Sequence, residues 1–131
     1  MKVLLDTHIW LWSLRNGERL GPKLRDILAD PQTELWLSPI SVWETVMLAE
    51  KGRIALQRPA DEWVRDALAK APVNEAPLTS EVALASRLID LPHEDPADRF
   101  LVATARVYDL RLATADKHLL RTKSCLILPN R

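Results

Sequence analysis

The stretch PADRFLVATARVYDLRLATAD, residues 96–116, contains a helix, a buried strand and two conspicuous acids, and the rest of the chain can be interpreted outward from it. Asp95 is a natural N-cap and Pro96 suits the first helical position, which predicts a helix from Pro96 to Tyr108. The apolar run Leu110–Ala113 then predicts a strand. A helix that leads directly into a buried strand is typical of α/β proteins with parallel sheets.

The same alternation continues on both sides of this stretch. Lys2–Leu5 is apolar after its lysine, as expected for a strand covered on both faces. Further strands are expected at Leu35–Leu37 and Cys125–Leu128, with a weaker candidate at Val73–Ala76. The intervening segments predict helices at His8–Arg15, Pro22–Ala29, Pro39 to about Lys51, Asp61–Ala71, Thr79–Ile89 and Lys117–Leu120. We therefore predict one α/β domain over residues 1–131, with a central parallel sheet and helices on both faces.

Composition excludes several classes of protein. The length of 131 residues suits one domain with a full hydrophobic core. The single cysteine, Cys125, excludes an internal disulfide framework and, lacking a Cys or His cluster around it, a structural zinc site. No apolar run approaches the ~20 residues of a spanning helix, and Asp6 interrupts the only apolar run near the N-terminus, so a cytoplasmic protein is expected. Because 18 basic residues balance 18 acidic ones, a nucleic-acid partner would need local basic patches.

Two acids are expected at the carboxyl ends of strands, where ligands bind in open parallel sheets. Asp6 follows the first strand, and Asp116 follows the strand and the residues Thr114-Ala115. The structural alternative is that each acid only caps the helix after it. Thr114 lies two residues before Asp116 and could hold the Asp116 carboxylate or a metal-bound water.

Two further acids are expected on apolar helix faces. Glu44 has Ile40, Met47 and Leu48 at helical spacing, and an ionised glutamate there is costly without a partner. The alternative is a capping box with Ser41, but the pair Ser38-Pro39 is the better helix start. Asp98 likewise lies above apolar neighbours, and its alternative role is to stabilise a helix N-terminus, which Asp95 fits better.

Together these four acids predict a divalent-metal site. Carboxylates gathered in a partly dry cleft raise one another's pKa, and a hard cation relieves that repulsion. Oxygen ligands favour Mg²⁺ or Mn²⁺. Zinc is disfavoured, because His8, His93 and His118 show no ligand spacing and are expected at the surface or at caps.

The chain resembles a PIN-domain protein, specifically the VapC-type toxin ribonuclease of a bacterial toxin–antitoxin pair. The resemblance covers nearly the whole length and rests on four motifs that occur in order: LLDTH with Trp10 and Trp12 (residues 4–8 onward), SPISVWE (38–44), DPADRFLVATA (95–105) and LATAD (112–116). It implies a parallel sheet of about five strands. It also implies an acidic quartet at Asp6, Glu44, Asp98 and Asp116 that binds Mg²⁺ or Mn²⁺.

The resemblance further implies auxiliary hydroxyls at Thr7, Ser41 and Thr114, and places Asp95 near the site. The implied reaction is metal-dependent endonucleolytic hydrolysis of RNA, leaving 5′-phosphate and 3′-hydroxyl ends. The implied partners are RNA, a cognate VapB-type antitoxin, and a second copy of the chain or a toxin–antitoxin hetero-oligomer, with no membrane.

Substrate contacts are predicted at basic residues as a group, although ordinary surface charge is the better explanation of any single one: Arg15, Arg19, Lys51, Arg53, Arg58, Lys117, Arg121 and Lys123. Tryptophans could stack on bases, but Trp10 and Trp12 suit burial in a protein interface. Two other functions stay open. One is an aspartyl-phosphate phosphatase, which would want an acid where His8 stands, and the other is a catalytically silent PIN-like binding module.

Overall fold

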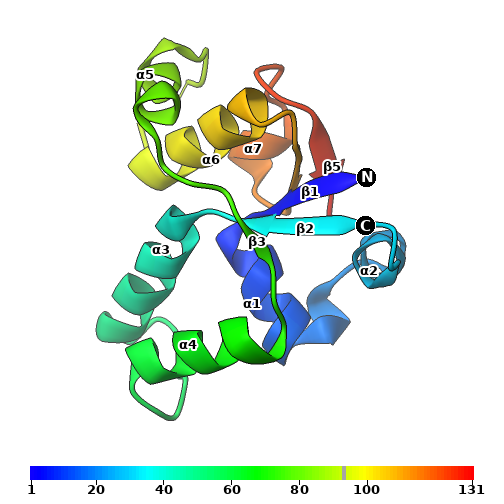
Figure 1. Ribbon diagram of the computed structural model, residues 1–131, viewed down its shortest axis with the longest axis vertical. Coiled ribbons are helices and arrows are strands. Elements are labelled where there is room, and N and C mark those ends of the chain that lie inside the picture. The colour runs from blue at the N-terminus through cyan, green and yellow to red at the C-terminus, as the bar shows by residue number, and fades with distance from the viewer. Residues whose placement is uncertain (93) are drawn as a thin grey trace.

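The computed structural model describes residues 1–92 and 94–131, so the expected surface or capping role of His93 lies outside the described residues. Five parallel strands form one sheet in the order β3-β2-β1-β4-β5 (Figure 1). Their bounds are Lys2–Leu5 (β1), Glu34–Leu37 (β2), Asn74–Glu75 (β3), Arg111–Thr114 (β4) and Ile127–Pro129 (β5). The prediction of a parallel α/β sheet is confirmed.

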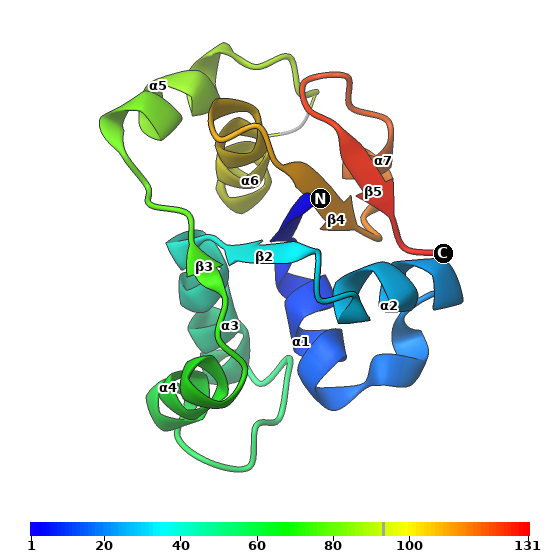
Figure 2. The same cartoon turned by 45° about the vertical axis from the view of Figure 1, so that its right-hand side comes forward.

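Seven α-helices and one 3₁₀ helix surround the sheet in the described residues. Their bounds are Thr7–Arg15 (α1), Gly17–Arg19 (η1, the 3₁₀ helix), Pro22–Ala29 (α2), Pro39–Glu50 (α3), Ala60–Lys70 (α4), Ser80–Leu88 (α5), Pro96–Val107 (α6) and Lys117–Leu120 (α7). Figure 2 shows α1 and α2 on one side of the sheet and α5 and α6 on the other.

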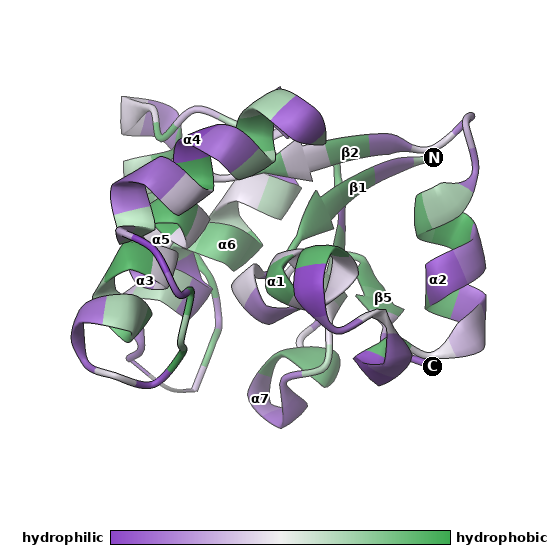
Figure 3. Cartoon of the chain, turned by 90° about the horizontal axis from the view of Figure 1, so that it is seen from below, coloured by the Kyte–Doolittle hydropathy of each residue, from purple (hydrophilic) through white to green (hydrophobic). Residues whose placement is uncertain are grey.

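The sequence of β1 is continuously apolar because its side chains point alternately to the two faces of the sheet and both faces are covered. Val3 and Leu5 pack into a cluster with α1, α2 and α4, whereas Leu4 packs into a second cluster with α6 and α7. Both sides are therefore dry, as expected for a central parallel strand. In Figure 3 hydrophobic colour follows β1, while α2 and α4 alternate between hydrophobic and hydrophilic residues.

Several predicted boundaries shift by a few residues. The first helix begins at Thr7 rather than His8, because Asp6 is its N-cap. β3 shrinks to Asn74–Glu75, an exposed edge pairing with β2, and β5 moves to Ile127–Pro129. Short strands at the edge of a sheet bury few side chains, so their apolar pattern is weak and their bounds are the hardest to predict from the sequence.

Strand order creates the crevice that positions the site. The chain runs from β1 outward through β2 and β3, then returns to place β4 and β5 on the other side of β1. The carboxyl ends of β1 and β4 therefore form a topological switch point, where open α/β sheets bind ligands. No helix within residues 1–92 and 94–131 is long and apolar enough to cross a membrane.

Candidate active site at the switch point

Asp6 is the most deeply buried acid at the switch point, and the residue is only 7% exposed. It follows β1 directly and caps α1, accepting a hydrogen bond on Oδ1 from the Thr7 amide at 2.7 Å. Its Oδ2 accepts a second bond from the Thr114 hydroxyl at 2.5 Å. Asp6 is thus both a helix cap and a candidate ligand at a strand end, so the two roles proposed for it are compatible.

Burial raises the pKa of Asp6 to about 6 from its ordinary 3.8. The hydrogen bonds from Thr114 and Thr7 oppose this rise, and the charge of Glu44 adds to it. The carboxylate is therefore held by donors yet remains short of compensating positive charge. Such a group favours binding of a cation.

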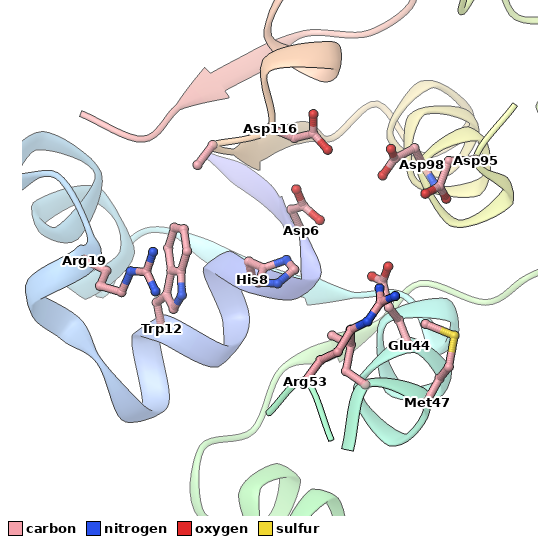
Figure 4. Close-up of a pocket in the computed structure, with 12 residues that line it drawn as sticks. Asp6, His8, Trp12, Arg19, Glu44, Met47, Arg53, Asp95, Asp98 and Asp116 are labelled. Atoms are coloured by element: carbon pink, nitrogen blue, oxygen red, sulfur yellow. The ribbon is translucent and has the colours of Figure 1, made fainter. Parts of the chain in front are cut away.

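The Thr114 hydroxyl binds the carboxylate of Asp6 and not that of Asp116, which corrects one prediction made from the sequence. The Thr114 side chain is fully buried and donates its proton to Asp6, while its oxygen accepts the Asp116 amide at 3.0 Å. The Asp116 carboxylate instead accepts the His118 amide at 2.8 Å and caps α7. Asp116 is half-buried and keeps its carboxylate toward the pocket (Figure 4).

Glu44 lies on α3, which begins at Pro39 with Ser38 as its N-cap. The Ser38 hydroxyl accepts the Ile40 amide at 3.0 Å, so Ser41 does not start the helix. The capping-box alternative for Glu44 therefore fails, because Glu44 lies beyond the first turn. Glu44 is half-buried and lines the same pocket as Asp6.

Asp98 lies in the first turn of α6, just after the cap Asp95, whose carboxylate accepts the Asp98 amide at 3.3 Å. The pKa of Asp98 is raised to about 8, chiefly by burial and then by the charges of Asp95, Asp6, Asp116 and Glu44. Four neighbouring acids therefore act on one carboxyl group. Asp98 is thus the acid of the site whose ionised form is most strongly disfavoured by burial and by the neighbouring carboxylates.

These acids line one pocket of about 540 Å³ at the carboxyl ends of β1 and β4 (Figure 4). Its other lining residues include two arginines, Arg19 from η1 and Arg53 from the loop after α3. The Arg19 guanidinium lies 4.5 Å from the centre of the Trp12 ring, and the centre of the His8 ring lies 5.9 Å from that of Trp12. The pocket thus combines an acidic wall with arginines and an aromatic ring.

Comparisons with known proteins identify the family of this chain. The family model described as PIN domain matches residues 3–124. This chain belongs to the PIN-domain family. Over 120 residues it is 35% identical to Ribonuclease VapC22 of Mycobacterium tuberculosis, covering 89% of this chain and 88% of that protein.

Solved structures share the fold of this PIN domain at low identity. They include VapBC2 from Rickettsia felis bound to a promoter DNA fragment, with a TM-score of 0.73, 13% identity and 98% of each chain covered. DNA-bound VapBC from Salmonella typhimurium has a TM-score of 0.73 and 16% identity, covering 100% of this chain and 99% of that one. FitAcB from Neisseria gonorrhoeae has a TM-score of 0.64 and 20% identity, with 96% of each chain covered.

The donor set of the PIN pocket fits a hard divalent cation. Every acid in it offers oxygen, and the raised pKa values of Asp6 and Asp98 show that burial and neighbouring acids disfavour their ionised forms, which a bound cation would stabilise. In the described residues no three acidic, histidine or cysteine side chains come close enough to form a ready-made metal cage. Carboxylates at this wider spacing suit an ion that keeps several of its own waters.

Of the expected auxiliary hydroxyls, only Thr114 contacts an acid of the quartet. The Thr7 hydroxyl donates to the Ser41 hydroxyl at 2.9 Å, and both side chains are fully buried. Neither is among the described residues that line the pocket. This pair joins α1 to α3, and so sets the position of Asp6 relative to Glu44.

Tryptophan positions also differ from expectation. Trp10 is 1% exposed and packs edge-on against Trp63 in the core, so it cannot contribute to a protein interface. Trp43, by contrast, is 56% exposed on α3. Helix α1 places Trp10 on its sheet-facing side and Trp12 beside the pocket. The apolar pattern of the sequence around them does not distinguish these two positions.

Arg99 has a structural role that its place in the sequence does not predict. Arg99 is 6% exposed, and its guanidinium donates to the carbonyls of Ser86, Ile89 and Leu91 at 2.9 to 3.1 Å. These carbonyls lie at and just beyond the C-terminal end of α5, where helix carbonyls lack helical partners. Arg99 therefore fixes α5 against α6 beside Asp98, and its signal in the sequence is only a charged residue within an apolar helix.

Proposed function

We propose that this PIN domain is the toxin component of a toxin–antitoxin pair and acts as a divalent-metal-dependent endoribonuclease that hydrolyses RNA phosphodiester bonds. The observation that carries the proposal is the meeting of Asp6, Glu44, Asp98 and Asp116 at one pocket. Membership of the PIN family and the likeness to Ribonuclease VapC22 support the reaction class.

Asp6, Glu44, Asp98 and Asp116 would hold the cation, Mg²⁺ or Mn²⁺, with Asp95 at the edge of the site. Such an ion, when bound, supplies an activated nucleophile at neutral pH and charge stabilisation for the phosphoryl oxygens. The protein's own part is to fix the carboxylates. The hydrogen bonds from Thr7 and Thr114 hold Asp6 in one orientation, and the His118 amide does the same for Asp116.

The arginines of the pocket suit contacts with an RNA backbone. Arg19 and Arg53 line the same pocket as the acids, and both are exposed. Guanidinium groups bind phosphate oxygens in a bidentate manner, which positions a strand without reading its sequence. The Trp12 ring beside Arg19 offers a face on which a base can stack.

Partners follow from the same proposal. A cognate VapB-type antitoxin would bind this chain, which would assemble as a homodimer or as a toxin–antitoxin hetero-oligomer. Support comes from the fold shared with the VapBC and FitAcB structures. The phosphatase alternative is disfavoured, because the position that needs its second acid is occupied by His8, an exposed residue packed against Trp12.

The decisive experiment is cleavage of end-labelled transfer and ribosomal RNA by purified chain free of antitoxin. Reactions would contain Mg²⁺, Mn²⁺ or EDTA, with Asp98→Asn as the test variant and Asp26→Asn, an exposed acid on α2, as the matched control. We expect discrete cuts that need metal, persist in Asp26→Asn and vanish in Asp98→Asn. Absence of cutting by folded wild-type protein with either metal would contradict the proposal and favour the silent binding module.

A further inference from the structure

A second pocket, of about 610 Å³, is lined by α7 and shares none of its described lining residues with the acidic pocket. The end of α5, the outer face of α6 and the loop after α7 surround it. Its polar lining residues include Arg106, His118, Arg121, Lys123, Asp90 and Ser124. The proposed hydrolysis does not use any of these side chains.

The charge of this second pocket is strongly one-sided. Arg106, Arg121 and Lys123 face a single acid, Asp90, in a chain whose overall charge is balanced. All three cations are exposed, and none of the ion pairs found among the described residues involves them. Three cations converging on one cavity produce a local positive potential, which attracts polyanions.

The walls of the pocket are held in place by hydrogen bonds. The Ser124 hydroxyl donates to the Asp90 carbonyl at 3.1 Å, which ties the loop after α7 to the segment after α5. Figure 2 shows these two segments side by side, as this hydrogen bond requires. The Ser124 amide donates to the Thr122 hydroxyl, and the fully buried Leu119 anchors α7 beneath them. The cations therefore project from an ordered frame.

Helix α7 connects this pocket to the acidic one. Asp116 caps α7 and lines the acidic pocket, while His118 on the same short helix and Arg121 at its end line the basic pocket. Four helical residues rise by only ~6 Å. A strand of a few nucleotides is long enough to lie across α7 and reach both pockets.

We propose that the basic pocket formed by Arg106, Arg121 and Lys123 is a subsite for the phosphate backbone of single-stranded RNA that continues from the acidic pocket. This inference rests on the proposed ribonuclease function and names how that site holds its substrate. The three cationic side chains that line the subsite suit phosphate oxygens, and contacts with phosphate carry no sequence information. It therefore contributes affinity rather than sequence choice.

The test compares the double variant Arg121→Ala/Lys123→Ala with Lys2→Ala/Lys23→Ala, which removes the same charge from exposed positions that line neither pocket. Binding of a fluorescent single-stranded RNA of mixed sequence is measured in EDTA over a range of salt. Loss of two phosphate contacts should make the slope of log K against log salt shallower by about 1.4. At low salt we expect the Kd to rise about 5- to 20-fold in the test variant and less than about twofold in the control.

Cleavage kinetics in Mg²⁺ separate this inference from the proposed function. We expect the KM to rise several-fold in Arg121→Ala/Lys123→Ala for long RNA, with a smaller change in kcat, and to stay unchanged for an oligonucleotide too short to cross α7. If wild-type protein cuts RNA but the test variant matches the control in Kd, salt slope and KM, the subsite is refuted while the ribonuclease stands. If wild-type protein binds RNA through these residues but cuts none, the proposed function fails instead. Arg121→Gln, a milder change, guards against misfolding as the cause of any loss.

Discussion

Replacing Asp98 with asparagine should stabilise the metal-free protein, although it removes a residue of the proposed metal site. The folded state raises the pKa of Asp98 from 3.8 to about 8, so between these values the folded chain binds more protons than the unfolded chain. Stability must then fall as pH rises through this window, and the loss is complete above about pH 8. An asparagine amide at this position does not ionise, so the variant does not lose this stability as the pH rises.

The size of the effect follows from the pKa shift after a correction for exposure. A shift of about four units corresponds to ~6 kcal/mol at 1.36 kcal/mol per unit. That value is an upper limit. Asp98 is only half-buried, and water and salt screen its interactions with the other acids, so the actual effect on stability is much smaller. We expect a gain of about 1–2 kcal/mol for Asp98→Asn at pH 8.5, or a melting temperature higher by ~4–8 °C.

Thermal and urea unfolding in EDTA at pH 4, 7 and 8.5 would measure this gain, with Asp26→Asn as the exposed control. The difference between Asp98→Asn and wild type should grow with pH and should nearly disappear at pH 4. Added Mg²⁺ should stabilise wild type but not Asp98→Asn, because ligand binding to the folded state adds stability. Equal or lower stability of Asp98→Asn at pH 8.5, with an unchanged pH slope, would refute the electrostatic reasoning.

Three further changes test the surrounding structure. Thr114→Val removes the hydroxyl that donates to Asp6, so we expect a loss of about 1–3 kcal/mol in urea unfolding, and Thr114→Ser should restore most of it. Arg99→Met deprives three carbonyls near the end of α5 of a charged donor, which should cost about 3 kcal/mol; unchanged hydrogen exchange in α5 would contradict this. Gly52→Ala forces alanine to φ 69° after α3 and should cost about 1 kcal/mol, whereas Gly17→Ala, with free space around its Cβ, should be nearly neutral in thermal unfolding.

Much of the fold could be predicted because its central elements carry strong local patterns. β1 is apolar throughout since helices cover both of its faces, and α6 is recognisable from Asp95, Pro96 and an apolar stripe. The four acids stood out for the same reason, as charges at strand ends or on apolar helix faces. Each of those signals depends on near neighbours in the sequence.

The remainder depends on contacts between distant segments. Arg19 reaches the acidic pocket because η1 packs beside the C-terminal residues of the chain. The Asn130 side chain donates a hydrogen bond to the Arg19 carbonyl there. Asn130 also accepts the Gly21 amide at 2.7 Å, and the backbone of Arg131 leaves no room for a Cβ at Gly21. No periodic pattern in the sequence links residues so far apart along the chain, so these placements were not predictable.

The pairing of β1 with β4 also governs when the site can exist during synthesis. Asp6 is made 108 residues before its partner Thr114 and the strand that positions Asp116. At typical rates of ~5–20 residues per second, the growing chain spends several seconds without a complete pocket. A nascent or prematurely terminated chain that stops before β4 would hold three of the four acids and no means of gathering them. For a protein proposed to destroy RNA, this delay keeps the translating ribosome and its message out of reach of an active site until β4 has been made and has paired with β1.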